Sequence, residues 1–332
     1  MLRQRYASLI RVVPRWPDIA LAAIVVGVVS TQAAQAQTTG PNQSRSPTES
    51  VTVTAPRQVP EATINEFVKT YAQPSAALGK LAKWKNGICP GVVGLPSQYN
   101  AFVTQRIKEV AALVEAPINS REACKINIDV VFTLKPQELL NNIRERHPIL
   151  LGYHDTSQSQ RIATVIHPIQ AWYTTQTEDL NGIRNVDYQQ NNQGVEMNLG
   201  PIGYDGQTVF LPSAREERID GSRFGDGLRT DFFHVVIVAD LNHLAGYQMG
   251  ALADYITWLA LAQTQSSDAC NEVSSITNLL ASSCAAANKT NSLSQFDLAF
   301  LRSLYATHAS DSLSSQQSTI EFKMAQELNG HK

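Results

Sequence analysis

The apolar residues of one long segment recur with the spacing of an α-helix. Residues 97–115 are predicted to form an amphipathic helix that Pro117 ends, with Ser97 as its N-cap. The positions predicted to face the core are Phe102, Ile107, Val110, Ala111 and Val114. This segment is the clearest surface helix in the sequence.

Other helical patterns differ in how much of their surface is apolar. Residues 247–263 are apolar nearly all round, which predicts a helix buried on most faces. Shorter helices are predicted at 61–72, from Pro136 to about Arg146, within Cys270–Cys284, and at 294–306. In the last of these, Ser294 and Asp297 occupy the N-cap and N3 positions.

Strands are indicated where β-branched residues cluster or alternate with polar ones. Residues 126–134 and 232–239 read as strands, and the second is apolar almost throughout, as in a buried central strand. Further strands are predicted at about 162–167 and 170–175, followed by a surface excursion at 181–206.

The order of these elements predicts an α+β fold with three layers, in which a mixed sheet holds the buried central strand and the buried helix packs on it. We expect one globular domain over residues 61–310. Residues 311–332 are expected to form a tail, in which Ile320, Met324 and Leu328 recur every four residues and favour a further helix.

The N-terminus has the pattern of a secretory signal peptide. Four arginines precede an apolar run from Ile19 to Val29, and the small-residue sequence Ala34-Gln35-Ala36 follows. We expect cleavage after Ala36 and a mature chain without a membrane span in the periplasm or outside the cell; the alternative is an uncleaved N-terminal anchor.

Residues 37–60 are rich in Gln, Thr, Ser and Pro and are predicted to be a disordered linker. Within it, Glu49–Ala55 resembles the short box by which outer-membrane receptors add a strand to an energising partner. No barrel sequence follows, so alternating Val and Thr in an ordinary linker is the other interpretation.

Composition narrows the function classes. The 332 residues carry 27 Lys plus Arg and 29 Asp plus Glu, a net charge of -2, with 17% charged residues. This balance argues against a nucleic-acid-binding protein and selects no partner by charge. No phosphate-binding Gly loop or nucleophile elbow occurs, so we expect no cofactor.

The cysteines number four, an even count that in an oxidising compartment predicts two disulfides. Three pairings are possible, and we favour the sequence-local ones, Cys89 with Cys124 and Cys270 with Cys284. A zinc site is the competing interpretation, but no Cys-x-x-Cys motif is present.

Two segments carry a resemblance to known proteins. Residues 250–261 (GALADYITWLAL) and 292–305 (SLSQFDLAFLRSLY) resemble the active-site helix and closing helix of metzincin-type zinc metallopeptidases, and Ser274–Asn278 lies where such proteins place a methionine turn. The sequences ICPGVVGL, GSRFGDGLR and GALADYITWLALAQ also resemble a family of exported proteobacterial proteins, a resemblance that implies no activity.

The chain departs from the peptidase pattern at the metal ligands. Zinc peptidases need two His at i and i+4 with an adjacent Glu, whereas this segment has Asp254 and Trp258 at that spacing and no His. The resemblance therefore implies a zincin-like core without a metal site, and we expect no bound metal. The alternative is an unrelated core helix.

Asp240 and His243 lie at the end of the central strand and are the candidates for acid–base chemistry. His234 lies too far along the strand from Asp240 to share an ion with it, at about 3.3 Å per residue. A role for Asp240 in tying its own loop is the favoured interpretation.

Arg223 and Arg229 flank a Gly-rich loop and are candidates for binding an anion or carboxylate, with structural Arg–Asp pairs as the alternative. Asp254, on a helix that is apolar all round, must be partnered or protonated. We predict Arg229, Arg223 or a backbone donor as its partner; a catalytic acid is the competing role.

These observations favour an exported, non-catalytic binding or envelope-associated module whose partner is a periplasmic protein or peptide. The rival hypothesis is a periplasmic hydrolase that acts on peptide or glycan through Asp254 with Asp240 or His243. Convergence of these groups in one open cleft would favour the hydrolase. Asp254 buried against an arginine would favour the binding module.

Overall fold

A computed structural model describes residues 58–121, 123–152, 158–187, 195–199, 207–211, 227–264 and 270–330. The signal-peptide and linker predictions up to residue 57, the Glu49–Ala55 segment and Arg223 lie outside these residues.

The core of the molecule is a mixed sheet in the order β1-β2-β7-β3-β4. The first three of these strands are parallel, and β3 and β4 continue the sheet antiparallel. A separate antiparallel pair, β5 and β6, lies outside this sheet. The strands are β1 Pro90–Val93, β2 Ile128–Thr133, β3 Ile169–Glu178, β4 Arg184–Val186, β5 Val195–Leu199, β6 Gln207–Leu211 and β7 Arg229–Asp240.

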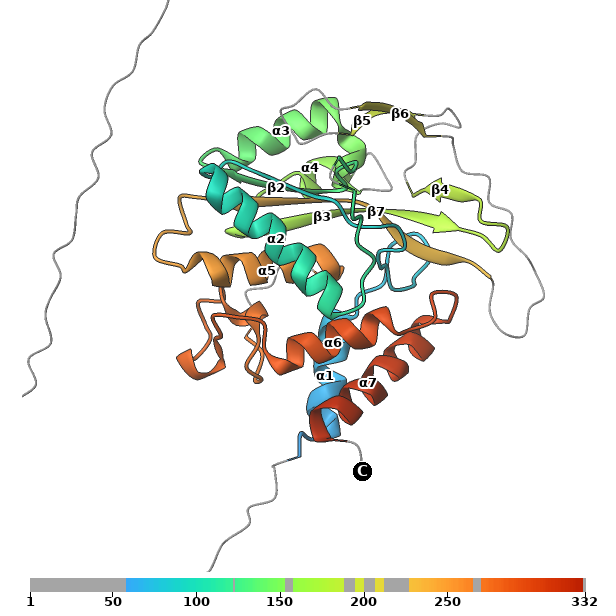
Figure 1. The fold of residues 1–332 in the computed structure, drawn as a ribbon, viewed down its shortest axis with the longest axis vertical. Coiled ribbons are helices and arrows are strands. Elements are labelled where there is room, and N and C mark those ends of the chain that lie inside the picture. The colour runs from blue at the N-terminus through green and yellow to red at the C-terminus, as the bar shows by residue number, and fades with distance from the viewer. Residues whose placement is uncertain are drawn as a thin grey trace, which may run out of the picture. The chain divides into compact units, whose positions relative to one another are not determined.

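Helices cover both faces of the sheet, which gives the predicted α+β arrangement (Figure 1). On one face lie α3 and α4, and on the other lie α2 and α5, with α1, α6 and α7 beyond α5. The helices and 3-10 turns are α1 Glu61–Tyr71, α2 Ser97–Leu113, α3 Pro136–Arg146, η1 Pro148–Leu151, α4 Ser159–Ile162, α5 Met249–Leu261, η3 Ile276–Asn278, η4 Ala286–Asn288, α6 Gln295–Tyr305 and α7 Leu313–Asn329.

The position of β7 in the middle of the sheet explains why its sequence is apolar. Val235 and Ile237 belong to the core cluster shared with α5, whereas Val236 and Val238 belong to the cluster shared with α3 and η1. Both faces of β7 are covered, so an apolar residue is favoured at nearly every position. The buried helix α5 follows, and all residues from Ala251 to Leu261 are buried.

The helical pattern noted in the C-terminal segment is the helix α7. Gln316, Ile320 and Met324 are its buried residues, and Ile320 and Met324 join the main core. The capping box predicted at the start of α6 is also present, with Ser294 Oγ and the Asp297 carboxylate satisfying each other's backbone amides.

The strand predicted at 162–167 is wrong. Residue 162 ends α4, and two backbone amides that a strand would pair are satisfied by side chains instead. Val165 N donates to Gln137 Oε1 at 3.0 Å and Ile166 N to Gln170 Oε1 at 3.0 Å. Glutamine side chains thus take the place of a neighbouring strand as acceptors. Ile166, an apolar residue of this segment, is 69% exposed.

Three further expectations need correction. The excursion at 181–206 contains two strands, β4 and β5. β4 pairs with β3 across a turn in which Asp179 Oδ1 accepts the amides of Asn181 and Ile183. The segment between Cys270 and Cys284 holds only the short η3 turn as helix among its described residues. The N-cap of α2 is Pro96, without a side-chain cap, rather than Ser97.

The buried face of α2 is rotated from the predicted one. Phe102 is 45% exposed, and Val103 is fully buried instead. Val103, Ile107, Val110 and Val114 keep i, i+4, i+7, i+11 spacing, which continues one stripe along the helix. Phe102 lies on the adjacent stripe, which stays outside the core.

A left-handed residue ends α2. Glu115 has φ 61°, and the amides of Ala116 and Glu115 donate to Ala111 O at 2.8 Å and Ala112 O at 3.3 Å. This is a Schellman arrangement, in which glycine usually occupies the left-handed position because it has no Cβ.

We expect Glu115→Gly to increase the free energy of unfolding by about 1 kcal/mol, because the left-handed conformation costs a side-chain-bearing residue about that much. Urea unfolding of the variant, beside Glu115→Gln as the control that keeps a Cβ, measures the effect. A Glu115→Gly variant no more stable than Glu115→Gln would contradict it.

Candidate functional site

Both predicted disulfides are present. Cys89 pairs with Cys124 and Cys270 with Cys284, and no free cysteine is found among the described residues. The first closes a segment that includes α2. The second closes a short loop that packs beside α5 and α6 and is the centre of a polar network.

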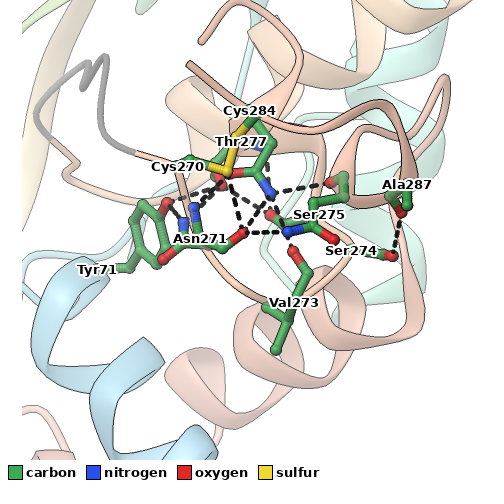
Figure 2. Close-up of a disulfide and its surroundings, with 11 residues drawn as sticks. Tyr71, Cys270, Asn271, Val273, Ser274, Ser275, Thr277, Cys284 and Ala287 are labelled. Atoms are coloured by element: carbon green, nitrogen blue, oxygen red, sulfur yellow. Dashed lines mark hydrogen bonds between the residues drawn. A yellow bond between two sulfur atoms is a disulfide. The ribbon is translucent and has the colours of Figure 1, made fainter.

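In that network, shown in Figure 2, buried side chains hold the loop in place through hydrogen bonds. Tyr71 of α1 donates from its hydroxyl to Thr277 Oγ1 at 2.7 Å, and Asn271 Nδ2 donates to the same tyrosine oxygen. Asn278 Nδ2 donates to three backbone oxygens, those of Asn271, Val273 and Asn288. Because Thr277 and Asn278 are buried, these bonds replace the water that the loop would otherwise need.

Asp297 connects this loop to α6. Its carboxylate accepts hydrogen bonds from Ser275 Oγ at 2.5 Å, Ile276 N at 2.9 Å and Ser294 N at 2.7 Å. Burial raises the pKa of Asp297, and these three hydrogen bonds oppose the rise. The carboxylate has no exposed surface, so its contacts define a structural tie.

Asp254 is buried and paired, but its partner is not in the Gly-rich loop. Arg106 of α2 donates from Nε to Asp254 Oδ1 at 2.5 Å and from NH2 to Oδ2 at 3.1 Å. Leu293 N donates to Oδ2 at 2.8 Å, which is the predicted kind of backbone donor. The prediction of Arg229 is therefore wrong, because α5 packs beside α2, which brings Arg106 to the carboxylate.

Asp240 and His243 meet at the end of β7. Asp240 Oδ2 lies 2.8 Å from His243 Nδ1, and Oδ1 accepts from Asn242 N at 3.0 Å and Nδ2 at 2.7 Å. Burial raises the pKa of Asp240, but the hydrogen bonds from Asn242 and His243 outweigh it and lower the pKa overall. The bonds to Asn242 are those of the predicted loop tie. The imidazole is two-thirds exposed, at 66%.

Arg229 lies in a cluster of charges at the other end of β7. Glu178, which faces Arg229 in the β3–β7 register, accepts from Lys85 Nζ at 2.5 Å, Arg184 Nε at 2.7 Å and Arg229 NH2. Arg229 Nε also lies 3.5 Å from Asp231 Oδ2. The guanidinium thus makes structural ion pairs with acidic residues of its own sheet.

Two groups in this charge cluster have pKa values shifted from their ordinary ones. Burial raises the pKa of Asp231 to about 6; the positive charge of Arg229 opposes the rise and the negative charge of Glu178 adds to it. Burial lowers the pKa of Lys83 to about 8. Groups with such pKa values suit proton exchange, although ion-pair networks shift pKa values in the same way.

Asp231→Asn is expected to flatten the dependence of stability on pH. The carboxyl titrates near 3.8 when unfolded and near 6 when folded, so the folded state binds more protons between these values and the free energy of unfolding falls as pH rises. Above pH 6 the variant should be more stable than the parent by up to about 3 kcal/mol. Urea unfolding at acidic and neutral pH, with exposed Glu145→Gln as control, measures this; an unchanged pH slope would contradict it.

One buried pair escaped the sequence analysis. His234 Nε2 lies 2.8 Å from Asp129 Oδ2, and both side chains are 1% exposed. The two residues lie on neighbouring parallel strands, β7 and β2. The available signal was an ionisable residue inside each of two apolar runs, Asp129 in 128–132 and His234 in 232–239, but the order of the strands was needed to interpret it.

The candidate residues do not form one site. Asp254, the Asp240–His243 pair and Arg229 share no hydrogen bond or ion pair. In the part of the chain that the structure describes, no group of three His, Cys, Asp or Glu residues is placed to hold a metal ion. Nor does any helix there combine the length and apolarity needed to cross a membrane.

Comparison with family models, with curated proteins and with solved structures finds no match for this chain.

Proposed function

We propose that this chain is an exported, non-catalytic binding module that works in the periplasm. The observation that carries the proposal is that the Asp254 carboxylate is already bound by groups of the protein. Both of its oxygens bind Arg106, and one also accepts the amide of Leu293, so the carboxylate joins α2, α5 and the segment before α6. It serves as a tie and offers no proton acceptor to a substrate.

Export is supported by two independent features. The first 36 residues have the arginines, apolar run and small-residue end of a signal peptide. All four cysteines are paired in disulfides, which persist in oxidising compartments. The periplasm is such a compartment.

We also propose that the core is zincin-like but lacks the metal ligands. In support, α5 is buried against the sheet, and η3 of the loop between α5 and α6 packs against α5, at the place in the chain where metzincins have their methionine turn. Asp254 and Trp258 stand where the His pair would be, and Trp258 packs against Phe67 and Phe300 in the core. On this proposal, the helix face that holds zinc in peptidases carries packing and ion-pair contacts in this chain.

The rival hydrolase keeps one observation in its favour. Asp240 holds His243 through Nδ1, and the imidazole is largely exposed, as a general base would be. Yet Asp240 and His243 bond neither to Asp254 nor to a hydroxyl that such a base would activate among the described residues.

Turnover and export can be tested on the same material. We would express the full chain with its own N-terminus and sequence the N-terminus of the periplasmic product, which should begin at Gln37. This product is incubated with peptide mixtures and peptidoglycan fragments, and cleavage is followed by mass spectrometry beside His243→Ala. We expect no cleavage beyond that of the variant. Cleavage that His243→Ala abolishes would establish the hydrolase instead.

A further inference from the structure

A cavity of about 480 Å³ lies between α6, α7 and the end of α2. Binding sites for small ligands commonly measure about 300–1,000 Å³. Among the residues that line it are Glu115, Arg302, Ser303, Lys323, Glu327 and Gly330. We call this cavity the α6–α7 groove. None of the candidate residues discussed above lines it.

The α6–α7 groove carries charges of both signs. Arg302 donates from NH1 to Glu327 and from Nε to Leu113 O at 3.4 Å, and its side chain stays 37% exposed. The side chains of Glu115 and Lys323 have no hydrogen-bond or ion-pair partner among the described residues. A carboxylate and an ammonium group are thus both available to a ligand.

Glu115 is the only non-glycine residue with positive φ among the described residues. The helix would end with less strain on glycine at this position, so the carboxylate is kept at a conformational cost. Backbone strain of this kind is concentrated at functional sites. Here it places an acidic side chain at the lining of the cavity.

We propose that the α6–α7 groove binds a short peptide segment, with Glu115 pairing a cationic group of the peptide and Lys323 and Arg302 pairing a carboxylate. Groups of both signs match a peptide better than a polyanion or a neutral glycan, because either would leave Glu115 or the cations without a partner. This inference rests on the proposed binding function and gives it a site and a ligand class.

The test selects a peptide and then removes the charges. The exported chain, tagged at its mature N-terminus to keep the groove free, is panned against a phage-displayed library of random short peptides. The enriched peptide is synthesised with a fluorophore and its Kd is measured by anisotropy. The variants are Glu115→Gln and Lys323→Gln, with Glu321→Gln on α7 and Lys108→Gln on α2 as controls of matched charge outside the groove.

We expect each groove variant to raise Kd by about tenfold and each control to leave it unchanged. Glu115→Gly should also lose binding while it melts at a higher temperature, which separates binding from folding. Panning that enriches no peptide, or a Kd that is the same in groove and control variants, would overturn the inference. Cleavage of a bound peptide would instead contradict the non-catalytic function and leave the groove in place.

Discussion

Replacing Arg106 by alanine is expected to lower the free energy of unfolding by about 3–5 kcal/mol, because it leaves a buried charge without its partner. The Asp254 side chain is 3% exposed and would keep only the Leu293 amide as a donor. Asp254→Ala should cost less, about 2–3 kcal/mol, because the Arg106 side chain is 34% exposed and its guanidinium can reach water.

A double-mutant cycle isolates the pair. Arg106→Ala combined with Asp254→Ala should cost about 1–3 kcal/mol less than the sum of the single changes, because the double variant leaves neither charged side chain without its partner. Urea unfolding gives the three values. Glu109→Gln is the control: Glu109 Oε2 lies 3.8 Å from Arg106 NH1 on the surface, and losing such a pair should cost less than about 1 kcal/mol.

The same cycle bears on function. A catalytic Asp254 predicts stability that holds or rises on substitution, since functional carboxylates are often destabilising where they sit. If both Asp254→Ala and Arg106→Ala unfold at or above the parent's urea midpoint, the structural tie is refuted and the hydrolase hypothesis gains. The outcome is informative before any substrate is known.

Local pattern was enough to predict much of the fold. The apolar run of β7, the all-round apolar surface of α5 and the capping box of α6 are each written in contiguous residues, and the predicted disulfides join cysteines 35 and 14 residues apart. Periodicity identifies which face of an element is buried. It does not identify what that face is buried against.

The misassigned parts depended on partners far along the chain. Arg106 and Asp254 are 148 residues apart, and Asp129 and His234 are 105 apart. Each pair exists only because β2 and β7 are neighbours in the sheet or α2 packs beside α5. The strand predicted at 162–167 failed for a related reason, since Gln137, 28 residues before Val165, satisfies its backbone.

Asp297→Ala is the second substitution expected to be severe. The carboxylate accepts three hydrogen bonds within the buried end of α6. Alanine would leave the amides of Ile276 and Ser294 without an acceptor and would remove one of the two side-chain partners of the Ser275 hydroxyl, the other being Thr277 Oγ1. At about 1–3 kcal/mol for each buried donor left unsatisfied, with partial relaxation, we expect a loss of about 3–5 kcal/mol. Ser294→Ala, which removes only the reciprocal cap, should cost about 1 kcal/mol.

The loss of stability in Asp297→Ala should begin in one part of the structure. Asp297 and the Cys270–Cys284 disulfide hold the same loop, so the variant should first expose the amides of η3, which hydrogen exchange measured residue by residue would detect. Asp297→Asn should be intermediate, because its amide keeps one acceptor oxygen for three donors. An Asp297→Ala protein that unfolds with the parent's midpoint and protects η3 equally would mean that the loop is held by the disulfide and Asn278, and that the carboxylate contributes nothing to it.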